Sequence, residues 1–243
     1  TRRGVVKKTE ITAYLNVRKT GMIAIKLNDG DSLKWVKTST GKDSVIMVSR
    51  DGQAIQFPEM DTRPMGRSAA GVRGMKLRSD DEVMSMDVIS HEPVFSGEVR
   101  KRQIEPDLMV VLQNGLGKRT QLSQFRDQSR GGVGIKAAKV TEKTGRLVEA
   151  VVTYGEQGDI LIISHQGQMI RLPLKSVKRL GRDTQGVTLM RLPKKDVVAS
   201  VSLITKDNNP EGITQLTADG QPIILPEISL PPEETSTPED KSK

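Results

Sequence analysis

The sequence of 243 residues is long enough for one large all-β domain or two small domains, and its formal net charge is +8. Because it has no cysteine, disulfide frameworks, cysteine nucleophiles and thiolate zinc sites are excluded, and a reducing, cytosolic setting is expected. No apolar run approaches the roughly 18 residues of a membrane span, and the first ten residues lack the apolar core of a signal peptide. We therefore expect no membrane partner.

The charge is unevenly distributed along the chain. Residues 227–243 hold five acidic residues and two lysines, whereas the remainder holds 36 basic and 25 acidic residues, a net charge of +11. A basic body indicates a polyanionic partner, although an ordinary basic protein with a solvated tail fits the same composition. Aromatic residues make up 2 % of the chain, too few to stack single-stranded bases. A nucleic-acid partner is therefore expected to be a duplex bound through its backbone.

Five segments share a pattern of strand, glycine turn and strand. Their turn glycines lie 48, 63, 52 and 53 residues apart, at Gly4, Gly52, Gly115, Gly167 and Gly220. The segments are TRRGVVKKTEI (1–11), SRDGQAIQFPE (49–59), LQNGLGKRTQL (112–122), SHQGQMIRLPL (164–174) and TADGQPIILPE (217–227). Asp-Gly and Asn-Gly pairs, present in three of them, accept the positive φ that tight hairpin turns require.

Further positions recur at fixed distances after the turn glycine. Arginine follows after fifteen residues, glycine after nineteen, and a basic residue before an apolar one after twenty-four. These columns are Arg67, Arg130 and Arg182; Gly71, Gly134 and Gly186; and Lys76, Lys139 and Arg191. The first repeat matches them through Gly21 and Lys26 if two residues are deleted.

Periods of about 50 residues with several short strands predict an all-β, propeller-like array in which each repeat forms a four-stranded blade. We expect about four blades with partial edges, and at least one further blade before Thr1. Two β-sandwiches are the alternative, but they do not explain the recurring columns. The expected repeats span residues 1–228 (1–44, 45–107, 108–159, 160–212 and a partial 213–228), followed by a disordered acidic tail at 229–243.

Several segments resemble the C-terminal domain of DNA gyrase A. They include VVKKTEI and GMIAIKLNDGD (5–31), RPMGRSAAGVRGMKL (63–77), QNGLGKRT (113–120) and GRDTQGVTLMRL (181–192). The resemblance implies a β-pinwheel whose blades exchange a strand, and a basic rim around which double-stranded DNA is wrapped. It further implies, as partners in ATP-dependent negative supercoiling, the rest of gyrase A together with gyrase B. A bacterial cytoplasm and nucleoid, and no cofactor, are implied as well.

Residues 128–134, QSRGGVG, resemble the seven-residue box of that family, Q-R-R-G-G-K-G, with Ser129 and Val133 as departures. Glycines let a backbone approach a phosphate closely, and an arginine donates to phosphate in a bidentate manner. The resemblance therefore implies DNA contacts by Arg130, Gly131, Gly132 and Gly134. The alternative is an inter-blade loop whose glycines serve turn geometry alone.

Basic residues also recur three and four positions after the turn glycine. Because successive side chains of a strand point to opposite faces, at least one member of each pair is expected to face outward, either toward DNA or as a solvated edge residue. With the arginine column, the predicted DNA-binding residues outside the box are Lys7, Lys8, Arg67, Lys118, Arg119, Arg171 and Arg182.

Catalysis has no support in the sequence. His91 and His165 lie in different repeats without metal-ligand spacing, Tyr14 and Tyr154 are expected to pack, and Trp35 is expected to fill a core. No metal site or phosphate-binding loop motif is found. Three alternatives remain: the paralogous domain of topoisomerase IV, a protein-interaction propeller, and a propeller hydrolase, which would need an acidic or histidine cluster.

Overall fold

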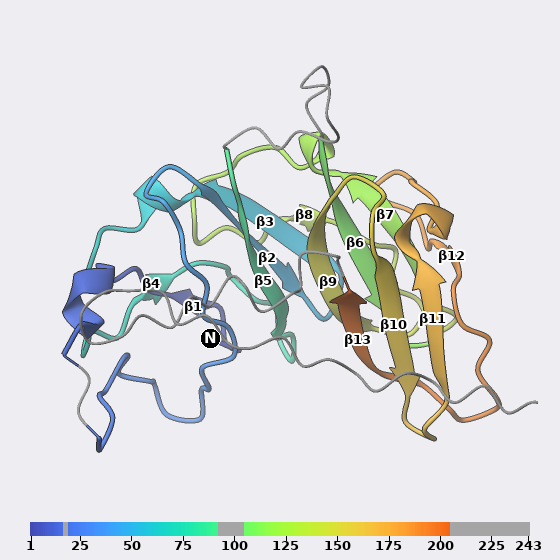
Figure 1. The fold of residues 1–243 in the computed structure, drawn as a ribbon, viewed down its shortest axis with the longest axis horizontal. Helices are drawn as coiled ribbons and strands as arrows, with labels where there is room; N and C mark the ends of the chain where they lie inside the picture. The colour runs from blue at the N-terminus through green and yellow to red at the C-terminus, as the bar shows by residue number, and fades with distance from the viewer. Residues whose placement is uncertain (17–18, 92–104, 205–243) are drawn as a thin grey trace, which may run out of the picture. The chain divides into compact units, whose positions relative to one another are not determined.

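The computed structural model describes residues 1–16, 19–91 and 105–204 (Figure 1). These residues form thirteen strands and four short 3₁₀ helices and contain no α-helix, which confirms the prediction of an all-β fold. No described helix is long and apolar enough to cross a membrane. The predicted partial repeat at 213–228 and the acidic tail at 229–243 lie outside the described residues.

Three of the sheets each contain one antiparallel hairpin (Figure 1). They are β2 (Ser44–Ser49) with β3 (Gln53–Pro58), β6 (Pro106–Leu112) with β7 (Leu116–Gln121), and β10 (Asp159–Ser164) with β11 (Met169–Pro173). The turn glycines Gly52, Gly115 and Gly167 have φ angles of +76°, +79° and +85°. The predicted hairpin turns are therefore confirmed at equivalent places in the three repeats.

A third strand of the same repeat joins each hairpin on its first strand. These strands are β5 (Val83–Ile89), β9 (Leu147–Tyr154) and β13 (Val198–Ile204). The register of each new pair shifts at the last residue of the hairpin's first strand, at Ser49, Leu112 and Ser164. A 3₁₀ helix follows the second hairpin strand of each repeat: η2 (Glu59–Asp61), η3 (Leu122–Gln124) and η4 (Leu174–Ser176). The three repeats are thus built alike down to their irregularities.

In three of the four described sheets, an outer strand comes from the following repeat. β8 (Ile135–Lys136) pairs with β3, β12 (Val187–Thr188) pairs with β7, and β4 (Val72–Arg73) pairs with β1 (Val5–Val6). The prediction that one repeat forms one four-stranded blade is therefore wrong in this detail, whereas the strand exchange implied by the resemblance is confirmed. Exchange pairs an edge strand that would otherwise be open, and it links successive repeats through backbone hydrogen bonds.

Both faces of the central strands are buried. On β6, Leu108 and Val110 pack into a cluster with Ile46 and Val48 of β2, whereas Met109 packs into a cluster with residues of β10. Sheets of neighbouring repeats therefore stack face to face, and alternate side chains of one strand serve two different cores. Tyr154 packs against the first of these clusters and Trp35 against a third, as predicted.

The first repeat departs from the predicted blade. In residues 1–16 and 19–43 the structure contains only β1 and the 3₁₀ helix η1 (Ile11–Tyr14). Large apolar side chains of this region, among them Ile11, Leu15, Ile23 and Val36, are exposed. The first repeat thus supplies one short strand, while the next three each carry a hairpin and an added strand.

Candidate nucleic-acid interface

The recurring glycines lie where the backbones of two repeats meet. Gly134, with φ +83°, lies so close to β3 that a Cβ there would be 2.4 Å from the carbonyl oxygen of Ala54. Gly186 has the same relationship to Gly117, and Gly71 to Val6. These glycines therefore permit strand exchange, since a side chain at their positions would collide with the neighbouring strand.

The glycines of the box-like segment are engaged by the protein itself. The amide of Gly131 donates to the carbonyl of Gly74 at 2.6 Å, and the carbonyl of Gly132 accepts from the amide of Lys76 at 2.8 Å. With Gly134 packed on β3, these glycines serve the contact between repeats, and DNA contacts by the backbone of Gly131, Gly132 and Gly134 stay a prediction. The alternative interpretation, an inter-repeat loop, fits these glycines.

Lys118 is buried rather than exposed. The residue is 0 % exposed, and its Nζ donates to the carbonyls of Gly181 (2.6 Å) and Arg182 (2.5 Å) and to the hydroxyl of Thr184 (3.1 Å). Burial lowers the pKa of Lys118 to about 8. Lys7 lies in the same way under the first exchanged loop, where its Nζ donates to the carbonyls of Arg67 (2.5 Å) and Ala24. Both lysines therefore bind protein carbonyls, and the expected DNA contact is wrong for Lys118.

Arg119 is also buried, at 3 % exposure. Its Nε donates to the carbonyl of Val177 at 2.9 Å, and its Nη1 lies 3.6 Å from the carboxylate of Asp107, which is fully buried. Arg179 adds a bond of 2.8 Å to the same carboxylate oxygen. Register explains the burial of both basic residues, because Lys118 lies opposite Val110 and Arg119 opposite Met109, residues of two different cores. The prediction that one member of this pair faces outward is wrong.

Lys8, which corresponds to Arg119, pairs with a carboxylate as well. Its Nζ lies 3.4 Å from Oε2 of Glu59 and donates to the carbonyl of that residue at 3.2 Å. Burial alone would raise the pKa of Glu59, but hydrogen bonds from Ser39 and from the amides of Asp43 and Gly41, with Lys8 nearby, hold it below its ordinary value. Lys8 is thus a structural cation at the base of the first repeat.

The arginine column remains at the surface. Arg67, Arg130 and Arg182 are all partly exposed. Arg130 donates from Nη1 to the carbonyl of Arg73 at 3.2 Å, and Arg182 makes the equivalent bond to Lys136 at 3.0 Å. Each of these two arginines therefore lies across the exchanged strand of the preceding sheet. Arg171 is 64 % exposed in its side chain and pairs with Asp159 at 2.6 Å.

The structure adds exposed basic residues that sequence reasoning missed. Arg73 and Lys136 occupy the outward position of the exchanged strands, twenty-one residues after the turn glycine. Three more lie eleven residues after it: Arg63, Arg126 and Lys178, all exposed. The column of Arg63, Arg126 and Lys178 could have been found from the sequence, because its members lie at a constant distance from the turn glycine. The predicted column Lys26, Lys76, Lys139 and Arg191 is exposed throughout, and the amides of its first three members donate to equivalent carbonyls of the following repeat, at Ala69, Gly132 and Thr184.

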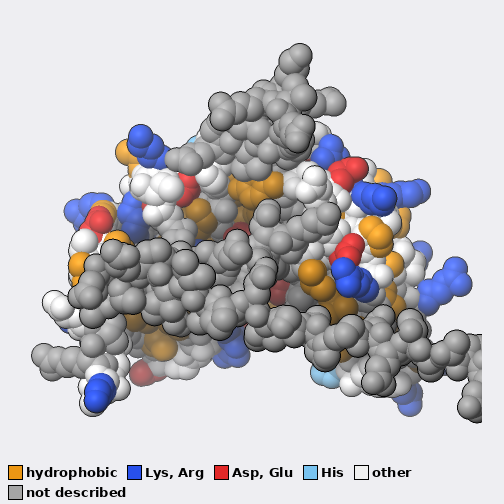
Figure 2. Space-filling model, in the orientation of Figure 1, with side chains coloured by type: hydrophobic (Ala, Val, Ile, Leu, Met, Phe, Trp, Pro, Cys, Tyr) orange, Lys and Arg blue, Asp and Glu red, His pale blue; other side chains and the backbone are white. Residues whose placement is uncertain are grey.

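In the view of Figure 2, lysine and arginine side chains protrude from the periphery of the described surface, with acidic side chains between them. Some of these acids form exposed pairs with the cations, as Asp183 does with Lys136 at 3.5 Å. Among the described residues, no group of three or more histidine, aspartate or glutamate side chains is placed to hold a metal ion. The recurring columns thus place cations at equivalent surface positions of successive repeats.

Stacked sheets that exchange their outer strands, with basic residues at equivalent surface positions, define a β-pinwheel, a member of the propeller class. The family described as "DNA gyrase C-terminal domain, beta-propeller" matches residues 1–39, 43–90, 107–153 and 158–205. The chain belongs to this family.

Relatives and solved structures agree with that assignment. The chain is 35% identical over 209 residues to DNA gyrase A of Staphylococcus epidermidis, covering 86% of the chain and 22% of the relative. It is 40% identical over 205 residues to DNA gyrase A of Kosmotoga olearia, covering 84% of the chain and 24% of the relative. The chain thus spans under a quarter of the length of these relatives.

Among solved structures, a DNA gyrase A C-terminal domain matches with a TM-score of 0.69 and 29% identity, over 84% of this chain and 63% of that one. The C-terminal domain of a DNA topoisomerase IV matches with a TM-score of 0.75 and 22% identity, over 85% and 60%. The second likeness establishes the fold alone. The sequence identities favour the gyrase branch over the topoisomerase IV branch.

Proposed function

We propose that the chain binds, bends and wraps duplex DNA without sequence preference, as the C-terminal part of gyrase A. The carrying observation is the partly exposed arginine at one equivalent position of three successive repeats, Arg67, Arg130 and Arg182. In the whole enzyme, the remainder of gyrase A together with gyrase B would supply strand passage and ATP hydrolysis, while this chain shapes the DNA path. The wrapped duplex would then support negative supercoiling.

Repetition is what suits this surface to DNA. A duplex presents one negative charge about every 1.7 Å along its axis, so a protein that meets it once per repeat needs the same cation in each repeat. Contacts to phosphate position the duplex and carry no direct sequence information. The flanking exposed cations Arg73 and Lys136 lie on strands adjacent to the arginine column and support the same interpretation.

The proposed interface differs from the one expected from the sequence. Lys118 and Arg119 lie outside the proposed interface because both are buried. The ammonium groups of Lys7 and Lys8 donate to backbone carbonyls and so contribute to loop packing. Arg67, Arg130 and Arg182 remain, joined by Arg73 and Lys136. Arg171 stays as a lesser contributor, because its guanidinium is already paired with Asp159.

The test is a salt titration of fluorescence anisotropy on two duplexes of unrelated sequence. Replacing Arg67, Arg130 and Arg182 together by Ala should weaken binding to both duplexes equally and lower the slope of log affinity against log salt by roughly 2–3. The control removes the same charge from exposed turn residues outside the columns, Lys42, Lys143 and Lys194. A triple arginine variant with the affinity and slope of the wild type would refute the proposed interface.

A further inference from the structure

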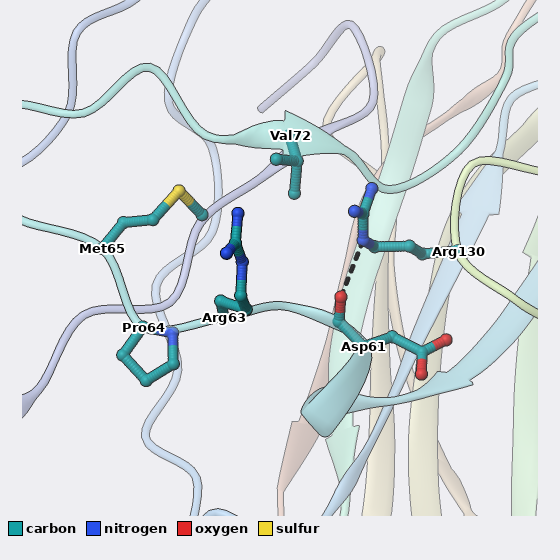
Figure 3. A pocket seen from close by; sticks show the side chains of 6 residues that line it. All are labelled: Asp61, Arg63, Pro64, Met65, Val72 and Arg130. Atoms are coloured by element: carbon teal, nitrogen blue, oxygen red, sulfur yellow. Dashed lines mark hydrogen bonds between the residues drawn. The ribbon is translucent and has the colours of Figure 1, made fainter.

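A pocket of about 220 Å³ lies at the junction between the second and third repeats. Arg63, Pro64 and Met65 of the loop after η2, with Val72 of β4, form most of its wall, and Arg130 closes it from the following repeat (Figure 3). Asp61 completes the lining. The pocket therefore exists only where two repeats meet.

Two guanidinium groups face this pocket. Figure 3 shows the side chains of Arg63 and Arg130 on two sides of it, whereas the carboxylate of Asp61 points away. Arg130 is held by bonds from Nε to the carbonyl of Asp61 at 2.8 Å and from Nη1 to the carbonyl of Arg73 at 3.2 Å. Within the described residues, its Nη2 and the whole guanidinium of Arg63 have no hydrogen-bond acceptor. Donors are therefore available on both sides without an acid between them.

The remaining wall is apolar. Pro64, Met65 and Val72 border the space between the two arginines. An apolar wall lowers the local dielectric, which strengthens the repulsion between the two cations and their attraction for an anion between them. Guanidinium groups match the tetrahedral oxygens of a phosphate group better than an ammonium does, because each presents a rigid pair of donors.

We infer that Arg63 and Arg130 form a two-arginine site for a single backbone phosphate of the duplex. This inference rests on the proposed DNA binding and adds that one phosphate is shared between two successive repeats. The site makes Arg63, which lies outside the box-like segment, a ligand of the same phosphate as the box arginine.

The arrangement has a counterpart one repeat further on. Arg126 follows its turn glycine by the same eleven residues as Arg63, and both are exposed. Arg182 is bound to the carbonyl of Lys136 as Arg130 is to that of Arg73. Because the two junctions share this spacing and this bond, the inference extends to a second phosphate site at Arg126 and Arg182. Each junction between described hairpin repeats would then hold one phosphate site.

A double-mutant cycle on the 243-residue chain tests whether the arginines share one phosphate. Arg63→Ala and Arg130→Ala should each weaken duplex binding by about three- to tenfold at about 0.1 M salt. The double variant should lower the salt slope by about 0.9 in total, the value for one phosphate, whereas independent contacts would lower it by about 1.8. Arg78→Ala, an exposed residue of the same repeat outside the pocket, is the matched control and should leave affinity within twofold. Additive effects, or an Arg63→Ala variant that behaves like Arg78→Ala, would overturn the shared site.

A second measurement does not depend on DNA. Titration with inorganic phosphate, followed by the arginine Nε–Hε signals in NMR, should shift Arg63 and Arg130 together along one saturating curve. The signal of Arg78 should drift linearly. If Arg63 and Arg130 drift as Arg78 does, the site is refuted even where duplex binding persists. If the wild type fails to bind duplex but the two signals saturate, the proposed function fails while the anion site stands.

Discussion

The ammonium of Lys118 lies 2.5 Å from the carbonyl oxygen of Arg182, so a buried cation of one repeat holds the loop that presents a partly exposed cation of the next. Lys7 and Arg67 repeat this relationship at 2.5 Å. In the intervening repeat the same position is the buried Ile55, whose Cδ1 lies 3.4 Å from where a Cβ on Gly132 would be. The loops that carry the surface arginines are thus held either by a buried lysine of the preceding repeat, which donates to loop carbonyls, or by an apolar contact with that repeat.

Replacing Lys118 by Met should destabilise the chain by about 2–4 kcal/mol, because the carbonyls of Gly181 and Arg182 would lose their buried donor. Urea unfolding followed by circular dichroism measures the change. The matched control is Arg171→Met, which removes one exposed charge and should shift the free energy of unfolding by less than about 0.5 kcal/mol. A Lys118→Met variant of unchanged stability but lower DNA salt slope would return Lys118 to the interface.

The same lysine should make stability depend on pH above neutrality. The unfolded chain holds this proton up to about the ordinary lysine pKa of 10.5, whereas the folded chain releases it near 8. Between these values the unfolded state binds more protons, so the contribution of Lys118 to the free energy of unfolding rises with pH. The difference between wild type and Lys118→Met, measured in urea at about pH 7, 8.5 and 9.5, should widen in favour of the wild type. A constant difference would contradict the lowered pKa.

Gly134→Ala should cost about 3 kcal/mol or more, because it adds a Cβ 2.4 Å from the carbonyl of Ala54 to a residue with φ of +83°. Two other glycines distinguish the cost of positive φ from the cost of the steric clash. Gly167 has positive φ but open space around a Cβ, so Gly167→Ala should cost about 1–2 kcal/mol. Gly66 has open space and no positive φ, so Gly66→Ala should be nearly neutral. Thermal and urea unfolding of the three variants give the order. Equal losses for Gly134→Ala and Gly167→Ala would show that close backbone approach is unimportant.

Arg119→Met should destabilise the chain by about 2–4 kcal/mol, since it leaves the buried carboxylate of Asp107 with Arg179 as its one remaining ion-pair partner in the described structure. Unfolding of the double variant Arg119→Met with Asp107→Asn completes the measurement. It should recover part of the loss, because the uncompensated charge is removed along with its partner. If the double variant is less stable than the sum of the single changes, the buried pair is not the cause.

The repeat period, the hairpin turns and the family could all be predicted from the sequence, because they depend on local requirements. A turn that needs positive φ selects glycine wherever it occurs, so Gly52, Gly115 and Gly167 mark the hairpins without any knowledge of packing. The basic column that contains Lys76 and Lys139 was equally predictable as a recurring position, since it lies at a fixed distance from the turn glycine.

Which basic residues face solvent was decided by the tertiary structure. Alternation along a strand places Lys118 and Arg119 on opposite faces, and the rule that one face is solvated fails because β7 belongs to a sheet packed on both sides. Strand exchange likewise brings Arg130 beside Arg63, although 67 positions separate them in the chain. Local sequence specifies turns and strands, but pairing between repeats sets the burial of each cation, because it depends on which distant backbone fills the neighbouring edge.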